Sequence, residues 1–254
     1  MTRGRQEMVS LAGRGGVVRT VPRIMIAIIG MCCLVGALGV GPASASSLST
    51  VHSTSFAGYQ ASLVTPVTTI SGTLTVPALT CPATGQVNLS AQVSAFSPSG
   101  QDAGFDWYAY CSNGVAYYNG ASVYTNNGGS TLVGANVGIA PGQTIKAAIN
   151  QNTVTGKTTV TIKNLTTLAN ASGSTPNLLS FVGVSAGLFD QNTSGVGMTI
   201  PSFSKVTFGK LLFNGAPFST LSSTRSDLYN GSTLQVATTP ISSTGTFSTV
   251  FKHV

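Results

Sequence analysis

The sequence predicts an all-β protein, a sandwich or jelly roll built from many short strands. The chain of 254 residues is rich in Thr, Ser, Val, Gly and Asn, and charged residues make up only 7% of it. Residues that favour strands and turns are therefore common, and good formers of surface helices are scarce. Apolar and polar residues alternate with a period of two in several segments, and turn residues separate these segments. Many short strands with turns between them favour a sandwich or a jelly roll.

The first 45 residues predict an export signal. A segment with five arginines precedes an apolar run at residues 24–40, and Ala43-Ser44-Ala45 has the small-x-small pattern of a cleavage site. We expect cleavage after Ala45, which leaves residues 46–254 as a single β-sandwich domain. The alternative is an uncleaved anchor, for which the apolar run is slightly short, because a membrane span needs about 20 residues. The predicted location is secreted, extracellular or in the cell envelope, with a membrane contacted only through an uncleaved signal segment.

Removal of the signal changes the charge of the chain. The full sequence has a formal net charge of +7, but residues 46–254 keep seven basic and four acidic residues, so their net charge is 7 − 4 = +3. This modest value gives no support to a nucleic-acid partner. The single glutamate, Glu7, lies in the signal. The acids that remain are Asp102, Asp106, Asp190 and Asp227.

The cysteines predict a disulfide and no metal site. Cys32 and Cys33 lie in the signal, so Cys81 and Cys111 remain. An even number of cysteines in an exported chain predicts one disulfide between them; the alternative is two buried free thiols. No Cys/His spacing indicates zinc, and we expect neither a metal nor another cofactor.

Alternation defines the strands of the N-terminal half. After a polar lead-in at residues 46–55, we predict strands at 56–64, 69–77, 87–96, 101–111 and 115–124. Pro77 ends the second strand, and Ser112-Asn113-Gly114 is a hairpin turn signal. One face of the strand at 101–111 carries Phe105, Trp107, Ala109 and Cys111. The opposite face carries Asp102, Asp106, Tyr108 and Tyr110.

The C-terminal half continues the pattern. We predict strands at residues 143–150, 157–163, 178–185, 196–200, 205–213, 233–238 and 246–251. The strand at 157–163 directs Val160 and Ile162 to one side and its lysines and threonines to the other. The simplest interpretation of this lysine–threonine face is a solvated surface. No strong internal repeat and no break large enough for a second domain interrupts the chain.

Five segments carry a family resemblance. They are Ser55-Phe-Ala-Gly-Tyr59, Ile70-Ser-Gly-Thr-Leu-Thr-Val-Pro77, Ala103-Gly-Phe-Asp-Trp-Tyr108, Ile139-Ala-Pro-Gly-Gln-Thr-Ile145 and Val160-Thr-Ile-Lys-Asn-Leu-Thr-Thr167. In this order they resemble segments of the glutamic peptidases, or eqolisins, which are secreted acid proteases. The resemblance covers most of residues 55–208. It implies a lectin/glucanase-like double-sheet β-sandwich of the jelly-roll type.

The resemblance fails at the residues that carry the chemistry of the family. Eqolisins use a glutamate to activate water and a glutamine to help hold the water and the developing oxyanion. Asp102 takes the place of the glutamine, and Gln101 is one residue away, where a strand side chain points to the other face. The place of the glutamate falls at Val184, and Gln92 corresponds to the tryptophan of the family's cleft. The resemblance therefore implies the fold and not the mechanism.

Two other catalytic arrangements fit the sequence poorly. Asp102 and Asp106 are about 13 Å apart along a strand that rises about 3.3 Å per residue. Without a bulge, this exceeds the separation of paired glycosidase carboxylates and of acids that share a proton. Gly183-Val-Ser-Ala-Gly187 matches a nucleophile elbow, but the elbow requires a helix after the serine, and none is predicted. Asp102 is kept as the one candidate catalytic residue.

A ligand groove is the remaining prediction. Aromatic rings beside polar groups suit a peptide or a sugar, although tyrosines more often pack across strands. The predicted groove contains Gln92, Asp102, Asp106, Tyr108 and Tyr110. The first hypothesis is a non-catalytic eqolisin-like protein that binds a peptide or glycan there or acts in the cell envelope. The second is a divergent acid peptidase of the same fold that uses Asp102, and the third is a lectin-like carbohydrate-binding protein.

Overall fold

The computed structural model describes residues 50–128, 130–190 and 200–252. Its strands are β1 (Thr50–Ser53), β2 (Phe56–Val67), β3 (Thr69–Thr75), β4 (Leu79–Thr80), β5 (Gln86–Phe96), β6 (Asp102–Ser112), β7 (Val115–Asn127), β8 (Ser130–Val137), β9 (Thr144–Asn152), β10 (Lys157–Asn164), β11 (Asn170–Thr175), β12 (Phe181–Phe189), β13 (Ser202–Phe203), β14 (Lys205–Phe213), β15 (Ala216–Pro217), β16 (Ser223–Asn230), β17 (Thr233–Thr238) and β18 (Phe247–Phe251), with a 3-10 turn, η1 (Phe218–Thr220). Within these ranges no helix is long and apolar enough to cross a membrane. The predicted signal segment lies outside the described residues, as does nearly all of the strand predicted at 196–200.

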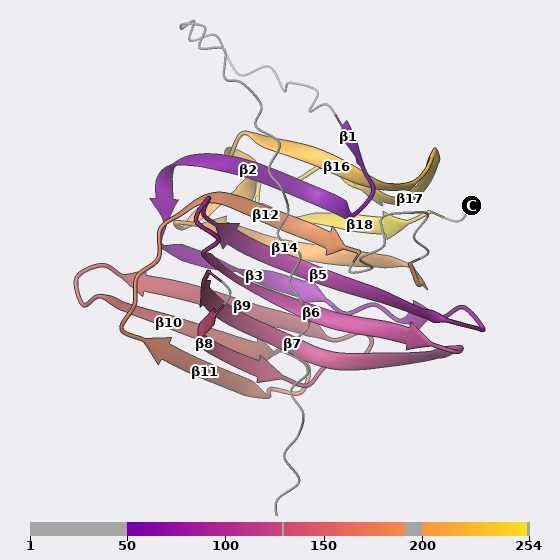
Figure 1. Cartoon of the computed structure of the whole chain (residues 1–254), viewed down its shortest axis with the longest axis horizontal. Helices are drawn as coiled ribbons and strands as arrows, with labels where there is room; N and C mark the ends of the chain where they lie inside the picture. Colours follow the sequence, from indigo (N-terminus) through magenta and orange to yellow (C-terminus); the bar gives the residue numbers. More distant parts are fainter. Residues whose placement is uncertain (1–49, 129, 191–199, 253–254) are drawn as a thin grey trace, which may run out of the picture. The chain divides into compact units, whose positions relative to one another are not determined.

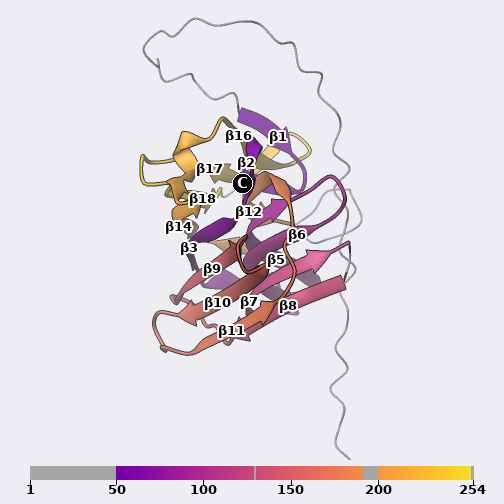
Figure 2. The same cartoon turned by 90° about the vertical axis from the view of Figure 1, so that its left-hand side faces the viewer.

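The strands form a sheet that folds back on itself into two layers (Figures 1 and 2). The hydrogen-bonded order is β11-β10-β9-β3-β14-β18-β17-β16-β2-β12-β5-β6-β7-β8. The strands β11 to β14 of this order form one layer and β2 to β8 form the other, while β18, β17 and β16 join them. The Trp107 indole N–H on β6 donates a hydrogen bond of 3.1 Å to the Thr75 carbonyl on β3 and so connects the two layers. This arrangement confirms the predicted all-β double-sheet sandwich.

The core lies between the layers and consists of the inward half of each strand. On β6, Phe105, Trp107 and Ala109 are fully buried, as the alternation of the sequence predicts. On the opposite layer, Ile149 of β9 and Val160 of β10 are buried and lie directly opposite each other in the register. Burial of a large apolar side chain stabilises a fold by about 1.5–3 kcal/mol. The two inward stripes therefore hold the layers together and fix which side chains point outward.

The last strands of the two layers lie against each other. β8 and β11 are the two ends of the hydrogen-bonded order. A Cβ atom at Gly173 of β11 would be only 2.6 Å from Val133 Cγ2 and 3.2 Å from the Gly134 carbonyl oxygen of β8. The lack of a side chain at Gly173 thus permits the edges to meet. Among the described strands, this seam is closed by contact and not by a ladder of hydrogen bonds.

Most of the predicted strands are present, with boundaries shifted by a few residues. β14 and β17 have the predicted bounds, whereas the strand predicted at 178–185 begins at Phe181 and continues to Phe189. The prediction missed β1, β8, β11 and β16, and also the two-residue strands β4, β13 and β15. The supposed polar lead-in contains β1, which pairs in parallel with β16. β11 and β16 read NASGST and STRSDLYN, and so few apolar residues produce no clear alternation.

Candidate ligand-binding face

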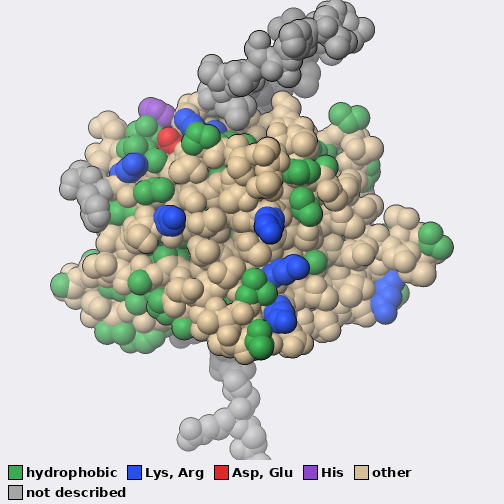
Figure 3. Space-filling view, turned by 180° about the vertical axis from the view of Figure 1, so that it is seen from behind, with side chains coloured by type: hydrophobic (Ala, Val, Ile, Leu, Met, Phe, Trp, Pro, Cys, Tyr) green, Lys and Arg blue, Asp and Glu red, His purple; other side chains and the backbone are tan. Residues whose placement is uncertain are grey.

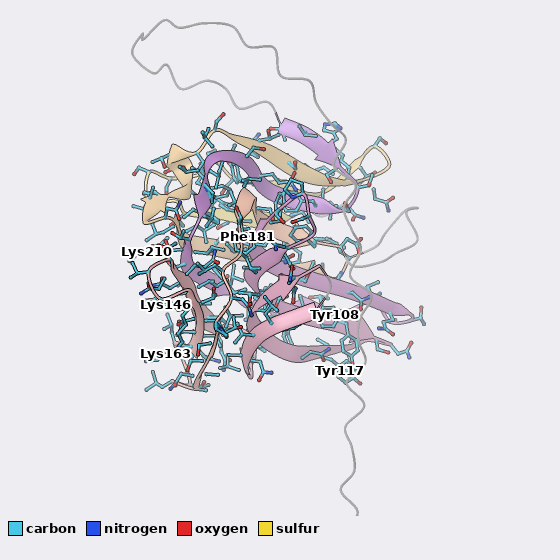
Figure 4. The ribbon with its side chains drawn as sticks, turned by 60° about the vertical axis from the view of Figure 1, so that its left-hand side comes forward. Tyr108, Tyr117, Lys146, Lys163, Phe181 and Lys210 are labelled. Carbon is cyan, nitrogen blue, oxygen red and sulfur yellow. A yellow bond between two sulfur atoms is a disulfide. The ribbon has the colours of Figure 1, made fainter. Side chains whose placement is uncertain are left out.

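The outward side of β5, β6, β7 and β12 brings together every residue of the predicted groove, and we call it the front face. Its side chains alternate with those that enter the core. They are Asn88, Ser90, Gln92, Ser94 and Phe96 of β5, Asp102, Asp106, Tyr108 and Tyr110 of β6, Tyr117, Ser122, Tyr124 and Asn126 of β7, and Gly183 and Ser185 of β12. Tyr108 and Tyr117 mark one end of this face in Figure 4.

Asp102 begins β6 and lies between Phe96 of β5 and Asn126 of β7. The Asn126 side-chain amide donates a hydrogen bond of 2.7 Å to the Asp102 carboxylate. Asn126 is only 1% exposed, so its end of this bond is shielded from water, where a hydrogen bond is electrostatically stronger. The Asp102 carboxylate, which is expected at the place of the family's glutamine, is therefore bonded to the neighbouring strand β7.

Asp106 lies further along the same face, between Gln92 of β5 and Ser122 of β7. The Ser122 hydroxyl donates a hydrogen bond of 2.5 Å to the Asp106 carboxylate. The Gln92 side-chain amide donates to the Tyr124 hydroxyl. Hydrogen bonds to an ionised group are shorter and stronger than those between neutral groups. Gln92, Asp102 and Asp106 of the predicted groove are thus each bonded to a side chain of β7.

The two aspartates do not form a catalytic pair. The pairing of β6 with β5 is continuous over the whole of β5, and the irregularity in its pairing with β7 falls between Tyr108 and Ala109. No bulge therefore shortens the distance between Asp102 and Asp106, which stays at about 13 Å for an extended strand. This separation excludes the carboxylate pairs of glycosidases and of aspartic proteases.

Val184, the expected place of the catalytic glutamate, faces the core. It is fully buried and is paired with Ala95 of β5 and Ala61 of β2. Because successive strand side chains point to opposite faces, the neighbouring positions that reach the front face are Gly183 and Ser185. Val184 therefore presents no side chain to the front face beside Asp102.

Neither of these two positions carries an acid. The Ser185 hydroxyl oxygen lies 2.9 Å from that of Ser94, in a buried hydrogen bond. A Cβ atom at Gly183 would be 2.3 Å from the Phe96 ring, so the ring occupies the space that a side chain would need. Ser185 also lies within β12, which continues as strand to Phe189. The strand–turn–helix setting of a nucleophile elbow is therefore missing.

Three tyrosines form a row at one end of the front face. The Tyr110 and Tyr117 rings stack with centroids 4.9 Å apart, and the Tyr108 ring is 6.2 Å from that of Tyr110. The Tyr108 hydroxyl donates a hydrogen bond of 2.8 Å to the Asn88 amide oxygen. Burial, and to a smaller extent the neighbouring Tyr110, raises the pKa of Tyr108. Tyr117 is 43% exposed, so the row presents aromatic surface to the solvent.

The predicted disulfide supports this end of the face. Cys81 and Cys111 are bonded, with Cα atoms 5.3 Å apart, and they tie the loop before β5 to the end of β6. The Tyr118 hydroxyl holds the same loop, because it accepts a hydrogen bond from the Leu79 N–H and donates one to the Pro77 carbonyl, both at 3.0 Å. Tyr118 is therefore a support of the front face and not part of its surface.

Several residues of the front face were not predicted. Alternation gives the face on which a side chain lies, but the partners of Asp102 and Asp106 on β7 depend on the register of a hairpin. The β7 partners missed in this way are Ser122 and Asn126, and Ser94 and Phe96 of β5 were not predicted either. In the part of the chain that the structure describes, no group of three or more His, Cys, Asp or Glu side chains could hold a metal ion.

Comparison with known proteins identifies one matching family model and several solved structures with a similar fold. A family model described as the peptidase A4 family matches residues 54–250. The structure is similar to scytalido-glutamic peptidase with a peptide-based transition state analog (TM-score 0.56, 18% identity) and to the same enzyme with a transition state analog inhibitor (TM-score 0.53, 17% identity). It is also similar to SCP-B, an eqolisin solved with the tripeptide Ala-Ile-His (TM-score 0.53, 17% identity). Each match covers 78% of this chain and 98% of the other. A search of curated proteins found no significant match in sequence.

Proposed function

This chain belongs to the peptidase A4, or eqolisin, family, and we propose that it is an exported, non-catalytic member that binds an extended peptide on its front face. The observation that carries the proposal is the set of groups beside Asp102. On β12, where the family's glutamate is expected, the front face has Gly183 beneath the Phe96 ring and Ser185 bonded to Ser94.

Peptide hydrolysis needs one group that activates water and another that stabilises the developing oxyanion. Asp102 supplies a single carboxylate, and that carboxylate already accepts a hydrogen bond from Asn126. Residues 46–254 contain no glutamate to act as its partner. The front face therefore retains polar groups for binding without the pair on which the mechanism of the family depends.

A peptide is the ligand that the front face suits best. Its centre offers side-chain carboxylate, amide and hydroxyl groups, and one end offers the tyrosine row, which is the combination that orients an extended chain and covers its apolar side chains. Two of the similar structures hold peptidic molecules, a peptide-based transition state analog in scytalido-glutamic peptidase and Ala-Ile-His in SCP-B. These ligands support a peptide here as well.

Two measurements on the purified protein test the proposal. Incubation with denatured protein substrates at acidic pH, in the presence of pepstatin, is expected to produce no new amino termini. A peptide library is expected to yield ligands whose affinity falls about ten-fold in Gln92→Ala, since a lost hydrogen bond to a ligand costs about 1.4 kcal/mol or more. Thr161→Ala, on the opposite side of the molecule, is the matched control and should bind as the parent does.

Two outcomes would decide against the proposal in different ways. Pepstatin-resistant cleavage that is abolished by Asp102→Asn would identify a divergent acid peptidase that uses Asp102. Absence of both cleavage and peptide binding would remove the front face as a peptide site.

A lectin-like function is the second candidate, and the stacked Tyr110–Tyr117 pair favours it. Aromatic rings with polar neighbours also suit the flat faces of sugars. Binding to a glycan array that is lost in Tyr108→Ala, with no peptide selected from the library, would establish this alternative.

A further inference from the structure

The side of the molecule opposite the front face is polar and cationic. We call the outward side of β3, β9, β10, β11 and β14 the back face. Its polar members are Thr69, Ser71, Thr73 and Thr75 of β3, Thr144, Lys146, Asn150 and Asn152 of β9, Lys157, Thr159, Thr161 and Lys163 of β10, Asn170, Ser172 and Ser174 of β11, and Lys205, Thr207 and Lys210 of β14. Ala148 and Leu212 are its apolar members.

Three of the lysines form one row across four strands. Lys163 of β10 lies directly opposite Lys146 of β9, Lys146 lies opposite Thr73 of β3, and Thr73 lies opposite Gly209, which precedes Lys210 on β14. Neighbouring strands are about 4.8 Å apart, so the row spans about 15 Å. Figure 4 shows Lys210, Lys146 and Lys163 projecting from the same side of the layer, one below another, away from Tyr108 and Tyr117.

This row is unfavourable for the isolated protein. Like charges directly opposite each other on antiparallel strands are destabilising, and Lys146 and Lys163 are such a pair. Lys210 has a φ of 50°, in the left-handed region, within a bulge of β14. A residue other than glycine rarely adopts this conformation, and strain of this kind is concentrated at functional sites. The repulsion between Lys146 and Lys163 and the strained backbone of Lys210 therefore occur in the same row.

The back face lacks the acids that would balance the row. None of the strands β3, β9, β10, β11 and β14 contains Asp or Glu. The acids among the described residues lie on β6, on β16 and just after β12. Figure 3 shows blue side chains spread over a mostly tan surface with scattered green side chains, and the red visible there lies at one place near the margin. The charge of the row is thus available to an anionic ligand.

The groups between the lysines indicate the class of ligand. Hydroxyl and amide side chains, such as those of Thr161, Ser172 and Asn170, suit the hydroxyl groups of a sugar. The back face has no aromatic ring on which the bases of a single-stranded nucleic acid would stack. The exposed aliphatic side chains near it, including Val154 and Leu168, lie on hairpin tips and not on the face, unlike the continuous apolar face that inserts into a membrane.

We infer that the back face binds a linear anionic polysaccharide, with Lys146, Lys163 and Lys210 contacting its acidic groups and the threonine, serine and asparagine side chains contacting its hydroxyls. Lysine acts as a point charge and does not form the paired hydrogen bonds that an arginine makes with a carboxylate. The site therefore recognises the negative charges of a polysaccharide chain, and it accepts either carboxylated or sulfated sugars. This site is independent of the front face and adds a partner of a different chemistry to the proposed peptide ligand.

Binding to immobilised polygalacturonate and heparin tests the inference, with dextran as the uncharged control. The triple variant Lys146→Gln, Lys163→Gln, Lys210→Asn is expected to bind about ten-fold or more weakly, because each lysine contributes charge contact with the polymer. The matched triple variant Lys157→Gln, Lys205→Gln, Lys252→Gln removes the same charge. Lys157 and Lys205 lie on the back face but outside the row to which the acidic groups are assigned, so this variant should lose about two-fold at most. Parent binding should fall as salt is raised. Circular dichroism and thermal melting confirm that both variants are folded.

Binding of polygalacturonate or heparin that is tighter than binding of dextran supports the inference. The polymer that binds more tightly of the two identifies the anion, a carboxylate for polygalacturonate or a sulfate for heparin. Equal losses in the two triple variants would overturn it in favour of net charge alone. Equal binding of dextran, or no binding of either acidic polymer, would also overturn it. Tighter, row-dependent binding to vesicles that contain phosphatidylserine would replace the polysaccharide with a membrane surface. Peptide binding by the front face should be the same in all of these variants, so each proposal can fail without the other.

Discussion

The front and back faces are the two outer surfaces of one folded sheet, and they treat polar side chains in opposite ways. On the front face the acids and amides are bonded across strands, as in the bond from Asn126 to Asp102. On the back face three lysines share a row whose strands carry no acid. The inward residues of both layers form the same kind of apolar core. Outward positions thus set the surface chemistry of this fold and inward positions set its stability, so a shared fold does not by itself imply a shared mechanism.

The largest effect is expected from a change in what the two faces share. Trp107→Ala removes a fully buried ring between the layers and leaves the Thr75 carbonyl without its donor. The free energy of unfolding should fall by about 3–5 kcal/mol, because the ring is lost and a cavity remains. Urea denaturation measures the change. Tyr117→Ala, on the exposed front face, is the control and should cost less than about 1 kcal/mol; similar losses in both variants would contradict the distinction between inward and outward positions.

A loss of stability of intermediate size should distinguish a front-face asparagine from a back-face asparagine. Asn126→Ala removes a buried donor to the Asp102 carboxylate, and a hydrogen bond to a charged group contributes about 1.5–3 kcal/mol. We expect a loss of that size in the free energy of unfolding, measured by thermal and chemical denaturation. Asn170→Ala on the exposed back face should change it by about 0.5 kcal/mol or less. If the two asparagines cost the same, the front face is not cross-linked in the way described.

The smallest effect should be a gain in stability on the back face. Lys146→Glu places an acid directly opposite Lys163 and converts a repulsive pair into an attractive one. The free energy of unfolding should rise by about 0.2–1 kcal/mol at low salt, and the gain should fade at about 1 M salt, where charges are screened within about 3 Å. Lys157→Glu faces Asn152 instead and should gain nothing from that pairing. A gain of the same size at both positions would point to net charge and not to the row.

The sequence was sufficient to predict which way side chains point but not which of them meet. The alternation of residues 101–111 correctly separated Phe105 and Trp107 from Asp106 and Tyr108, because burial of one face of a strand follows directly from its pattern. The register between strands depends on turn geometry and long-range packing, which a single strand does not encode. For this reason the alternation did not identify Asn126 as the partner of Asp102.

The segments that resemble the family include residues that hold the fold. Asn164 is fully buried, and its amide donates hydrogen bonds to the Gly138 carbonyl at 3.0 Å and to the Gln143 amide oxygen at 2.7 Å. Gln143 also accepts a hydrogen bond from the Ala140 N–H at 2.8 Å. Two separate segments of the resemblance are thus joined in one buried network. A resemblance carried by such residues predicts architecture well and chemistry poorly.

The seam between β8 and β11 brings together the two end strands of the sheet. An edge strand with free N–H and C=O groups is a template on which a strand of another molecule can assemble, and natural sheets cover or blunt such edges. Here each edge covers the other, and the close contact depends on the missing side chain of Gly173. A valine at this position would separate the edges and uncover two templates at once. The glycine that permits this close contact lies on neither the front face nor the back face.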